Sequence, residues 1–214
     1  MVRWLGRLGL RLVGWRAVGR APDRSVVLIA APHTSNWDLL YMLLVAAELG
    51  IDVHWVGKHT LFRPPLGWLM RAVGGIPVDR RARHGAVAQL ARAFEERPGL
   101  VLAVAPEGTR GKAPYWKSGF YEIARGAGVP IACGFLDYAR KEGGIGPLIE
   151  VTGDRLRDMD AIRAFYADKT GKHPEDFTPP RLREEVAGGD DQPAAGSAAQ
   201  ASETSSTASA KKGA

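Results

Sequence analysis

Short apolar runs alternate with helical patterns from Val26 onward, and this alternation constrains the fold more than any other feature of the chain. A continuous apolar run at residues 26–31 predicts a buried strand, and a helical pattern follows from about Asn36 to Leu49. Further strands are predicted at residues 53–56, 76–78, 100–105, 129–137 and 148–152, and further helices at 66–73, 85–96, 118–126 and 160–169. Apolar strands that alternate with helices are typical of a sheet covered on both faces. The sequence therefore predicts a single α/β domain with a central, mostly parallel mixed sheet flanked by helices.

The chain divides into three predicted segments: a basic, amphipathic N-terminal helix at residues 1–22, the α/β domain at 23–186 and a tail at 187–214. From Ala187 to the end there is no Val, Ile, Leu, Met or aromatic residue. Such a segment cannot bury enough apolar surface to offset the entropy cost of ordering it, so we expect a disordered tail.

The first twenty residues combine arginine with tryptophan and leucine. Five arginines and no acidic residue occur there, which accounts for most of the net charge of +6. At 100° per residue, a single helical stripe holds Trp4, Leu8, Leu12 and Trp15. This pattern favours a helix that lies on anionic lipid, so we expect an anionic membrane surface as a partner, and no nucleic acid. The alternative is a helix that packs on its own domain.

Two features predict the compartment. The single cysteine, Cys133, cannot form an internal disulfide, which favours a reducing environment. The chain shows neither the roughly 18–20 apolar residues that a membrane-spanning helix needs nor a clean apolar region after its first charges. We therefore expect a cytoplasmic protein bound peripherally to the inner face of the membrane.

A polar turn after the run at 26–31 holds a histidine and an acid five positions apart, His33 and Asp38. The carboxyl end of a strand is where open α/β sheets present ligands. From there the ring of His33 could turn toward Asp38, and the pair could take a proton from a substrate hydroxyl. The alternative is structural, because Ser35 and Asp38 have the spacing of an N-cap serine and a capping-box acid.

A second polar turn, PEGTRGK at residues 106–112, follows the predicted strand at 100–105. Gly108 allows a ligand to approach the backbone closely, and Arg110 suits bidentate binding of a phosphate. Further basic groups stand at Lys58 and at residues 78–84, VDRRARH. For each of these segments, the alternative is a solvated surface.

Four motifs in order resemble those of the glycerolipid acyltransferase family, which includes the lysophosphatidic acid acyltransferases. The H-x-x-x-x-D motif corresponds to His33 and Asp38, and the second motif to Lys58 with GGIPVDR, which ends at Arg80. The E-G-T-R motif corresponds to residues 107–110 and the V-P-I motif to residues 129–131.

The resemblance implies an O-acyltransferase of phospholipid biosynthesis. It would move a fatty acyl group from acyl-CoA or acyl-carrier protein to a hydroxyl of a lysophospholipid or glycerol-phosphate acceptor, with no bound cofactor and no metal. His33 would be the general base, held by Asp38. The implied substrate-binding residues are Lys58, Arg80, Glu107, Gly108, Thr109, Arg110, Lys117 and Pro130. Among them Arg80 and Arg110 would contact the acceptor phosphate, and Pro130 would shape the acyl-donor side.

Two other functions compete with this one. A non-catalytic module that binds anionic lipid would use the basic residues but would not require His33 beside Asp38. A metal hydrolase would use His33, Asp38, His54 and His59, although their spacings match no standard helix-borne metal site.

Overall fold

The computed structural model describes residues 2–78 and 83–189, and within them the chain forms one α/β fold around a seven-stranded sheet. The strands are β1 (Arg16–Val18), β2 (Val26–Ala31), β3 (Val53–Lys58), β4 (Gly75–Val78), β5 (Val101–Val104), β6 (Ile131–Asp137) and β7 (Glu142–Ile149). The α-helices are α1 (Val2–Leu12), α2 (Trp37–Leu49), α3 (Gly67–Ala72), α4 (Arg83–Glu96), α5 (Gly119–Ala127), α6 (Arg155–Tyr166) and α7 (Arg183–Gly189). Two 3-10 helices are η1 (His59–Phe62) and η2 (Pro174–Asp176).

The sheet is mixed and mostly parallel, as predicted. Its order is β1-β7-β6-β2-β5-β3-β4. The strands from β6 to β4 in this order run parallel, whereas β7 pairs antiparallel with β6 and parallel with β1. The carboxyl ends of β2, β5 and β3 are therefore neighbours at one edge of the sheet. Both polar turns start at this edge, which is the edge where open α/β sheets hold ligands.

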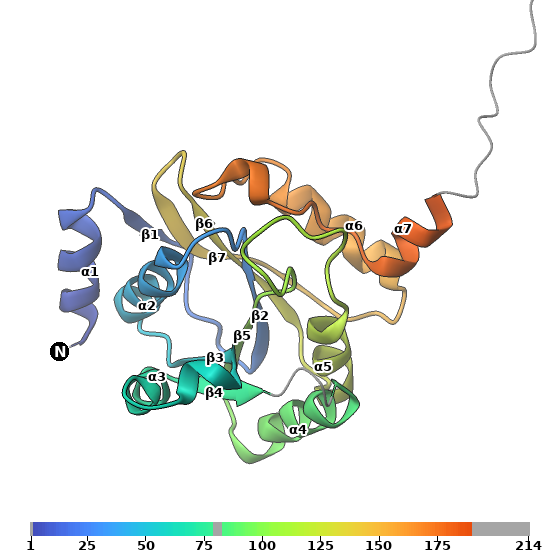
Figure 1. Cartoon of the computed structure of the whole chain (residues 1–214), viewed down its shortest axis with the longest axis horizontal. Helices are drawn as coiled ribbons and strands as arrows, with labels where there is room; N and C mark the ends of the chain where they lie inside the picture. The colour runs from blue at the N-terminus through green and yellow to red at the C-terminus, as the bar shows by residue number, and fades with distance from the viewer. Residues whose placement is uncertain (1, 79–82, 190–214) are drawn as a thin grey trace, which may run out of the picture.

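Helices cover both faces of the sheet (Figure 1). On one face, α4, α5 and α6 pack on strand residues such as Ile29 and Leu102. On the other face, α2 and α3 pack on residues such as Leu28 and Trp55, and α1 packs in turn on α2. Because β2 lies at the centre and is covered on both sides, its whole sequence, VVLIAA, is apolar.

The N-terminal helix is shorter than predicted and ends at Leu12, so the prediction of a helix over residues 1–22 is wrong beyond that point. Gly14 follows with a φ of 72°, a left-handed conformation that favours glycine, and the chain then enters β1 beside β7. Trp15 is buried rather than part of an exposed stripe, and it stacks on Tyr41 with ring centroids 4.3 Å apart.

The helix α1 has two different faces. On one face Leu10 is fully buried, and a Cβ atom at Gly6 would lie 2.6 Å from the backbone nitrogen of Glu48 in α2. Glycine is unfavourable within a helix, but at position 6 it lets α1 approach α2 closely. A second face leaves apolar side chains in contact with solvent, namely Trp4, Leu5, Leu8 and Leu12. Packing on the domain and an exposed apolar stripe thus occur together.

The strand predicted at residues 148–152 lies earlier in the chain, as β7. Its sequence, EGGIGPLI, hides the strand pattern because glycine and proline are rare in strands. A Cβ atom at Gly144 would lie 1.9 Å from the carbonyl oxygen of Val18, and one at Gly146 would lie 2.3 Å from the ring of Phe165. The glycines are therefore required for β1 and α6 to pack this closely on β7.

At the C-terminal end, α6 begins at Arg155 rather than near 160, and α7 includes residues 187–189 of the segment predicted as a tail. The remainder of that segment, 190–214, lies outside the described residues. None of the helices in the described ranges is long and apolar enough to cross a bilayer.

Candidate active site

The turn after β2 brings His33 and Asp38 together. The Nδ1 atom of His33 lies 3.2 Å from Oδ2 of Asp38, whose residue is only 5% exposed. Asp38 belongs to the first turn of α2, while His33 lies just before that helix and remains part-exposed. The predicted pairing of histidine and acid is therefore present in the structure.

Asp38 also has the structural role that its spacing suggested. Its Oδ2 atom accepts hydrogen bonds from the backbone N–H groups of Thr34 at 2.9 Å and Ser35 at 2.8 Å. Ser35 Oγ in turn accepts from the N–H of Trp37 at 3.3 Å, although the residue that precedes the helix is Asn36 rather than Ser35. The same carboxylate thus closes the start of α2 and faces the imidazole, so the structural role does not exclude the predicted chemical one.

Glu107 belongs to the second turn, and it is only 1% exposed. Its Oε1 accepts from the backbone N–H of His33 at 2.8 Å, and its Oε2 accepts from the N–H of Thr178 at 3.4 Å. The structure corrects the expectation that Glu107 lines the acceptor site, because its side chain turns inward and ties the two turns together.

Burial raises the pKa of Glu107 from 4.5 to about 7. The N–H groups of His33 and Thr178 favour the carboxylate and lower its pKa, but they do not outweigh burial. The negative charges of Asp38 and Asp176 add to the rise. The Glu107 side chain, which joins the two turns, therefore changes its charge near neutral pH.

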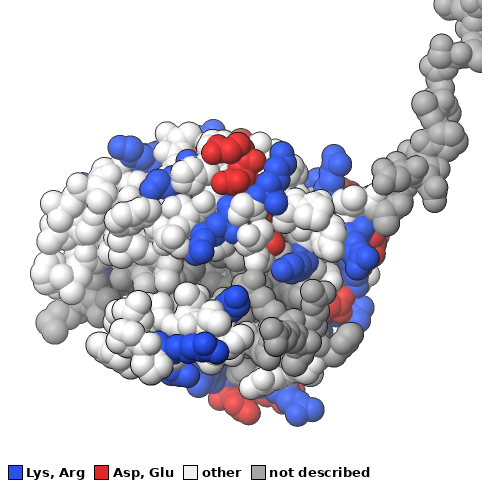
Figure 2. Space-filling view, in the orientation of Figure 1, with Lys and Arg blue, Asp and Glu red and all other residues white. Residues whose placement is uncertain are grey.

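A cleft of about 740 Å³ opens at this edge of the sheet, and His33 is part of its wall. The second turn contributes Gly108, Thr109 and Arg110 to the wall, and Lys58 contributes from the end of β3. Apolar residues from α2, β3, η1 and α3 complete it, including Leu39, Met42, Trp55, Leu61 and Met70. Figure 2 shows a hollow in this face of the molecule with Lys and Arg side chains around it. The cleft can therefore hold a molecule with an anionic group and an apolar part.

The two turns also meet through their polar side chains. The guanidinium group of Arg110 donates to the side-chain oxygen of Asn36 in the first turn. Gly108 has a φ of 67°, and a Cβ atom there would lie 2.5 Å from Nζ of Lys117. A glycine is therefore needed at 108, and Lys117 lies against the second turn as a further cation.

A further predicted residue, Pro130, is not brought to the cleft. Pro130 precedes β6, and its carbonyl oxygen accepts from the N–H of Val27 at 3.1 Å, at the beginning of β2. It therefore lies at the opposite edge of the sheet from His33, and the predicted role on the acyl-donor side does not fit this position. Arg80 falls in the segment 79–82, which lies outside the described residues.

A segment near the C-terminus, residues 170–182, crosses both turns and was not predicted as part of the site. The N–H of His173 donates to Thr34 Oγ1 at 3.1 Å, and Thr178 Oγ1 accepts from the N–H of Ala113 at 2.8 Å. Tyr138 was also missed, and its hydroxyl lies 2.6 Å from Asp38 Oδ1. Its position directly after the predicted strand 129–137 was a usable signal, since that strand ends at the same edge of the sheet.

Within residues 2–78 and 83–189, no group of three or more His, Cys, Asp or Glu side chains is arranged to hold a metal ion. His54 lies within β3 and pairs in the sheet with Leu102, whereas His59 begins η1 after the strand has ended. The alternative of a metal hydrolase thus finds no ligand cluster in this part of the chain.

Comparison with known proteins identifies relatives of this chain. The family model described as Acyltransferase matches residues 17–133, which is more than half of the 214 residues. Among solved structures, the chain is similar to the 1-acyl-sn-glycerophosphate (LPA) acyltransferase PlsC from Thermotoga maritima. The two share 17% sequence identity with a TM-score of 0.57, over 78% of this chain and 77% of the other, so the likeness concerns the fold. No curated protein matches the chain.

Proposed function

Because this chain belongs to the acyltransferase family, we propose that it moves a fatty acyl group from a thioester to a hydroxyl of a lysophospholipid or glycerol-phosphate acceptor. The observation that carries the proposal is the pairing of His33 with buried Asp38 in the wall of a cleft that also contains Lys58 and Arg110. A surface that only binds lipid would not require a histidine held in this way.

In the proposed reaction, Nδ1 of His33 stays directed at Asp38 and Nε2 takes the proton of the acceptor hydroxyl. The acceptor oxygen attacks the thioester carbonyl carbon, the carbon–sulfur bond breaks, and the imidazolium returns the proton to the departing thiolate. The products are an ester and a free thiol. A positioned general base of this kind contributes roughly 10²–10⁴-fold to the rate, and the carboxylate of Asp38 stabilises the imidazolium that forms.

The acceptor is proposed from the charges around the cleft. Arg110 and Lys58 line it, and Lys117 lies against Gly108, so an acceptor that carries a phosphate would be held beside His33. The solved relative acts on 1-acyl-sn-glycerophosphate, and we propose an acceptor of that class here. The donor would be acyl-CoA or acyl-carrier protein, since both deliver the acyl group as a thioester.

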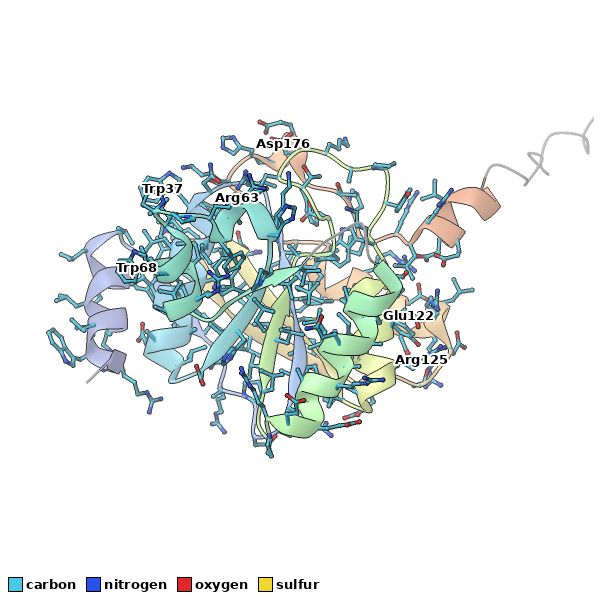
Figure 3. The ribbon with its side chains drawn as sticks, turned by 60° about the horizontal axis from the view of Figure 1, so that its bottom comes forward. Trp37, Arg63, Trp68, Glu122, Arg125 and Asp176 are labelled. Atoms are coloured by element: carbon cyan, nitrogen blue, oxygen red, sulfur yellow. The ribbon has the colours of Figure 1, made fainter. Side chains whose placement is uncertain are left out.

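We further propose that the protein works peripherally on the cytoplasmic face of a membrane. Two exposed apolar surfaces support this: the stripe of α1 described above, and a rim formed by Leu61 of η1, by Trp68 and Leu69 of α3, and by Leu66 just before α3. Trp68 is 72% exposed, and Figure 3 shows it on the same side of the molecule as Trp37 and Arg63. Apolar side chains with neighbouring cations are suited to an anionic bilayer surface.

The membrane proposal is tested by sedimentation with vesicles that contain anionic phospholipid. The double variant Trp4→Ser, Leu12→Ser should bind at least roughly tenfold more weakly, because each apolar side chain contributes about 1.5–3 kcal/mol when buried. The control is Leu156→Ser on α6, which removes a side chain that is 62% exposed elsewhere. Equal sedimentation of the double variant and the control would contradict the proposed contact.

The transfer reaction is tested with purified protein, labelled acyl-CoA or acyl-carrier protein, and a panel of lysolipids, with products identified by mass. His33→Ala should reduce turnover by roughly 10²-fold or more, while His59→Ala, which alters an exposed histidine in η1, should stay near wild type. Full activity of His33→Ala would refute the proposed base. Vesicle binding without transfer from either donor would instead support a non-catalytic lipid-binding module.

A further inference from the structure

We propose that Tyr138 is a positioning residue for acyl transfer: its hydroxyl donates to Asp38 and thereby fixes the carboxylate that orients His33. The inference rests on the proposed function, because it gives Tyr138 a role only if His33 is the base. It adds a third side chain to the pair, one that lies 100 residues away from Asp38 in the sequence.

The partners of Asp38 are divided between its two oxygens. Oδ2 faces His33 Nδ1 and accepts from the N–H groups of Thr34 and Ser35. Oδ1 accepts from the hydroxyl of Tyr138 at 2.6 Å, the shortest of these contacts. Rotation of the carboxylate about its last bond would break the bonds on both sides at once. The phenol therefore holds the carboxylate plane in the orientation that presents Oδ2 to the imidazole.

Tyr138 is itself fixed by its surroundings. Its backbone N–H donates to the carbonyl oxygen of Thr170 at 2.8 Å. Its ring meets the ring of Trp15 edge-on at 4.8 Å and that of Tyr41 edge-on at 5.7 Å. Aromatic pairs in this arrangement are favourable and directional, so the hydroxyl has little freedom to leave Asp38.

The electrostatics agree with a donor role. Burial, with the hydrogen bond to Asp38 as the next cause, raises the pKa of Tyr138 well above its ordinary value, so the phenol stays protonated. A donor on Oδ1 spreads the negative charge of the carboxylate and moderates its attraction for the imidazolium. Other titratable or charged groups lie around these residues. Tyr41 of α2 acts on Tyr138, Asp38 acts on Glu107, and Lys58 and Arg110 line the same cleft as His33. In the segment 170–182, Asp176 acts on Glu107, the backbone N–H of His173 binds Thr34, and Lys172 lies over the ring of Trp37.

The test compares two variants, each of which removes a hydrogen bond from a tyrosine hydroxyl to a buried aspartate. Tyr138→Phe removes the hydroxyl that binds Asp38, and Tyr121→Phe removes a buried hydroxyl that donates to Asp158 at 2.9 Å between α5 and α6. A hydrogen bond to a charged group is worth about 1.5–3 kcal/mol. We therefore expect Tyr138→Phe to lower kcat roughly tenfold or more with little change in KM, and Tyr121→Phe to lower thermal stability without lowering kcat.

A pH profile separates positioning from general loss of structure. In Tyr138→Phe the carboxylate loses a donor and binds the imidazolium more strongly, so the acid limb of kcat/KM should move upward by about 0.5–1 pH unit. The titration midpoint of the His33 imidazole, followed by NMR without substrate, should rise by the same amount. Neither should move in Tyr121→Phe.

The outcomes distinguish the two proposals. If His33→Ala is inactive while Tyr138→Phe keeps the wild-type kcat, acid limb and His33 midpoint, the role of Tyr138 is refuted and the proposed function stands. If His33→Ala remains active, the base itself is refuted. The NMR midpoint tests the contact even where no acceptor in the panel is turned over, since an unchanged midpoint overturns the role of Tyr138 by itself.

Discussion

The two polar turns at the edge of the sheet begin in the same way and are organised differently. The turn after β2 directs its acid, Asp38, toward the imidazole beside the cleft and satisfies it with two backbone donors and a phenol. The turn after β5 directs its acid, Glu107, into the interior and leaves Thr109 and Arg110 facing the cleft. In the proposed function, the first turn would hold the proton acceptor and the second would bind the charged ligand.

The difference shows that an acid in a polar turn can serve two purposes at the same edge of a sheet. Asp38 faces the imidazole of His33, whereas Glu107 joins segments that are distant in the sequence. The buried carboxylate of Asp38 accepts hydrogen bonds from two backbone N–H groups and from the hydroxyl of Tyr138, so both of its oxygens have donors. Glu107 accepts from two backbone N–H groups, but burial outweighs them and raises its pKa.

The largest expected effect would come from the first turn. In Asp38→Asn, a carboxamide replaces the carboxylate, so it no longer stabilises the imidazolium and one of its polar atoms becomes a donor. By analogy with other histidine–acid pairs, kcat should fall roughly 10²–10⁴-fold with a smaller change in KM. Steady-state kinetics with the acceptor found in the panel would measure this. If kcat of Asp38→Asn stayed within a few fold of wild type, Asp38 would not act on the reaction and would not differ from Glu107 in this respect.

The matching change in the second turn, Glu107→Gln, should act on stability rather than on chemistry. The folded-state pKa of about 7 lies above the unfolded value of 4.5. Between these pH values the folded protein therefore binds more protons than the unfolded chain does. The stabilising contribution of Glu107 to the free energy of unfolding is present below pH 4.5 and is lost as the pH rises through 7. From the two pKa values, the loss amounts to about 3 kcal/mol.

Denaturant unfolding at pH 4.5 and pH 8 measures this effect. The stability advantage of wild type over Glu107→Gln should shrink by about 3 kcal/mol between the two pH values. Glu95→Gln, an exposed position on α4, provides the control and should follow wild type at both. If Glu107→Gln has the same pH dependence as wild type, the inward carboxyl does not titrate as its burial implies.

The smallest of the three effects should come from Arg110. Its guanidinium group faces the cleft, so Arg110→Ala should raise KM for a phosphate-bearing acceptor by roughly 10-fold and change kcat less, because a charged hydrogen bond of about 1.5–3 kcal/mol is lost. Arg97→Ala, an exposed position that follows α4, is the matched control. With a neutral monoacylglycerol the effect should disappear. An equal rise for neutral and phosphorylated acceptors would show that Arg110 shapes the turn instead of binding the phosphate.

The sequence predicted most of the sheet because its central strands are continuous apolar runs, and β2 is the clearest case. It failed where packing, rather than pattern, decides the structure. In β7, glycines are present because Val18 and Phe165 approach too closely for a side chain. The length of α1 was overestimated because Trp15 suited an exposed stripe equally well, and only the positions of Tyr41 and Tyr138 make a buried place for it.

The site followed the same rule. His33 and Asp38 were predictable because one turn of chain contains both, so their contact is local. The inward direction of Glu107 was not, because the partner that shows it, Thr178, lies 71 residues further along the chain. Tyr138 lies even further from its partner, 100 residues along the chain from Asp38. Pro130 matched a motif, but the strand that follows it begins at the opposite edge of the sheet from His33. Residue spacing thus identifies contacts within a turn and misses those that the tertiary fold creates.

The bonds made by residues 170–182 have a practical consequence for anyone who exchanges parts between homologous enzymes. The family match ends at residue 133, so a chimaera cut there would retain every motif while replacing Thr178 and the neighbours that hold Glu107 and Thr34. Such a hybrid would combine the cleft residues of one parent with supporting residues from the other. A chimaera that takes residues 17–133 and 170–182 from the same parent would keep these hydrogen bonds.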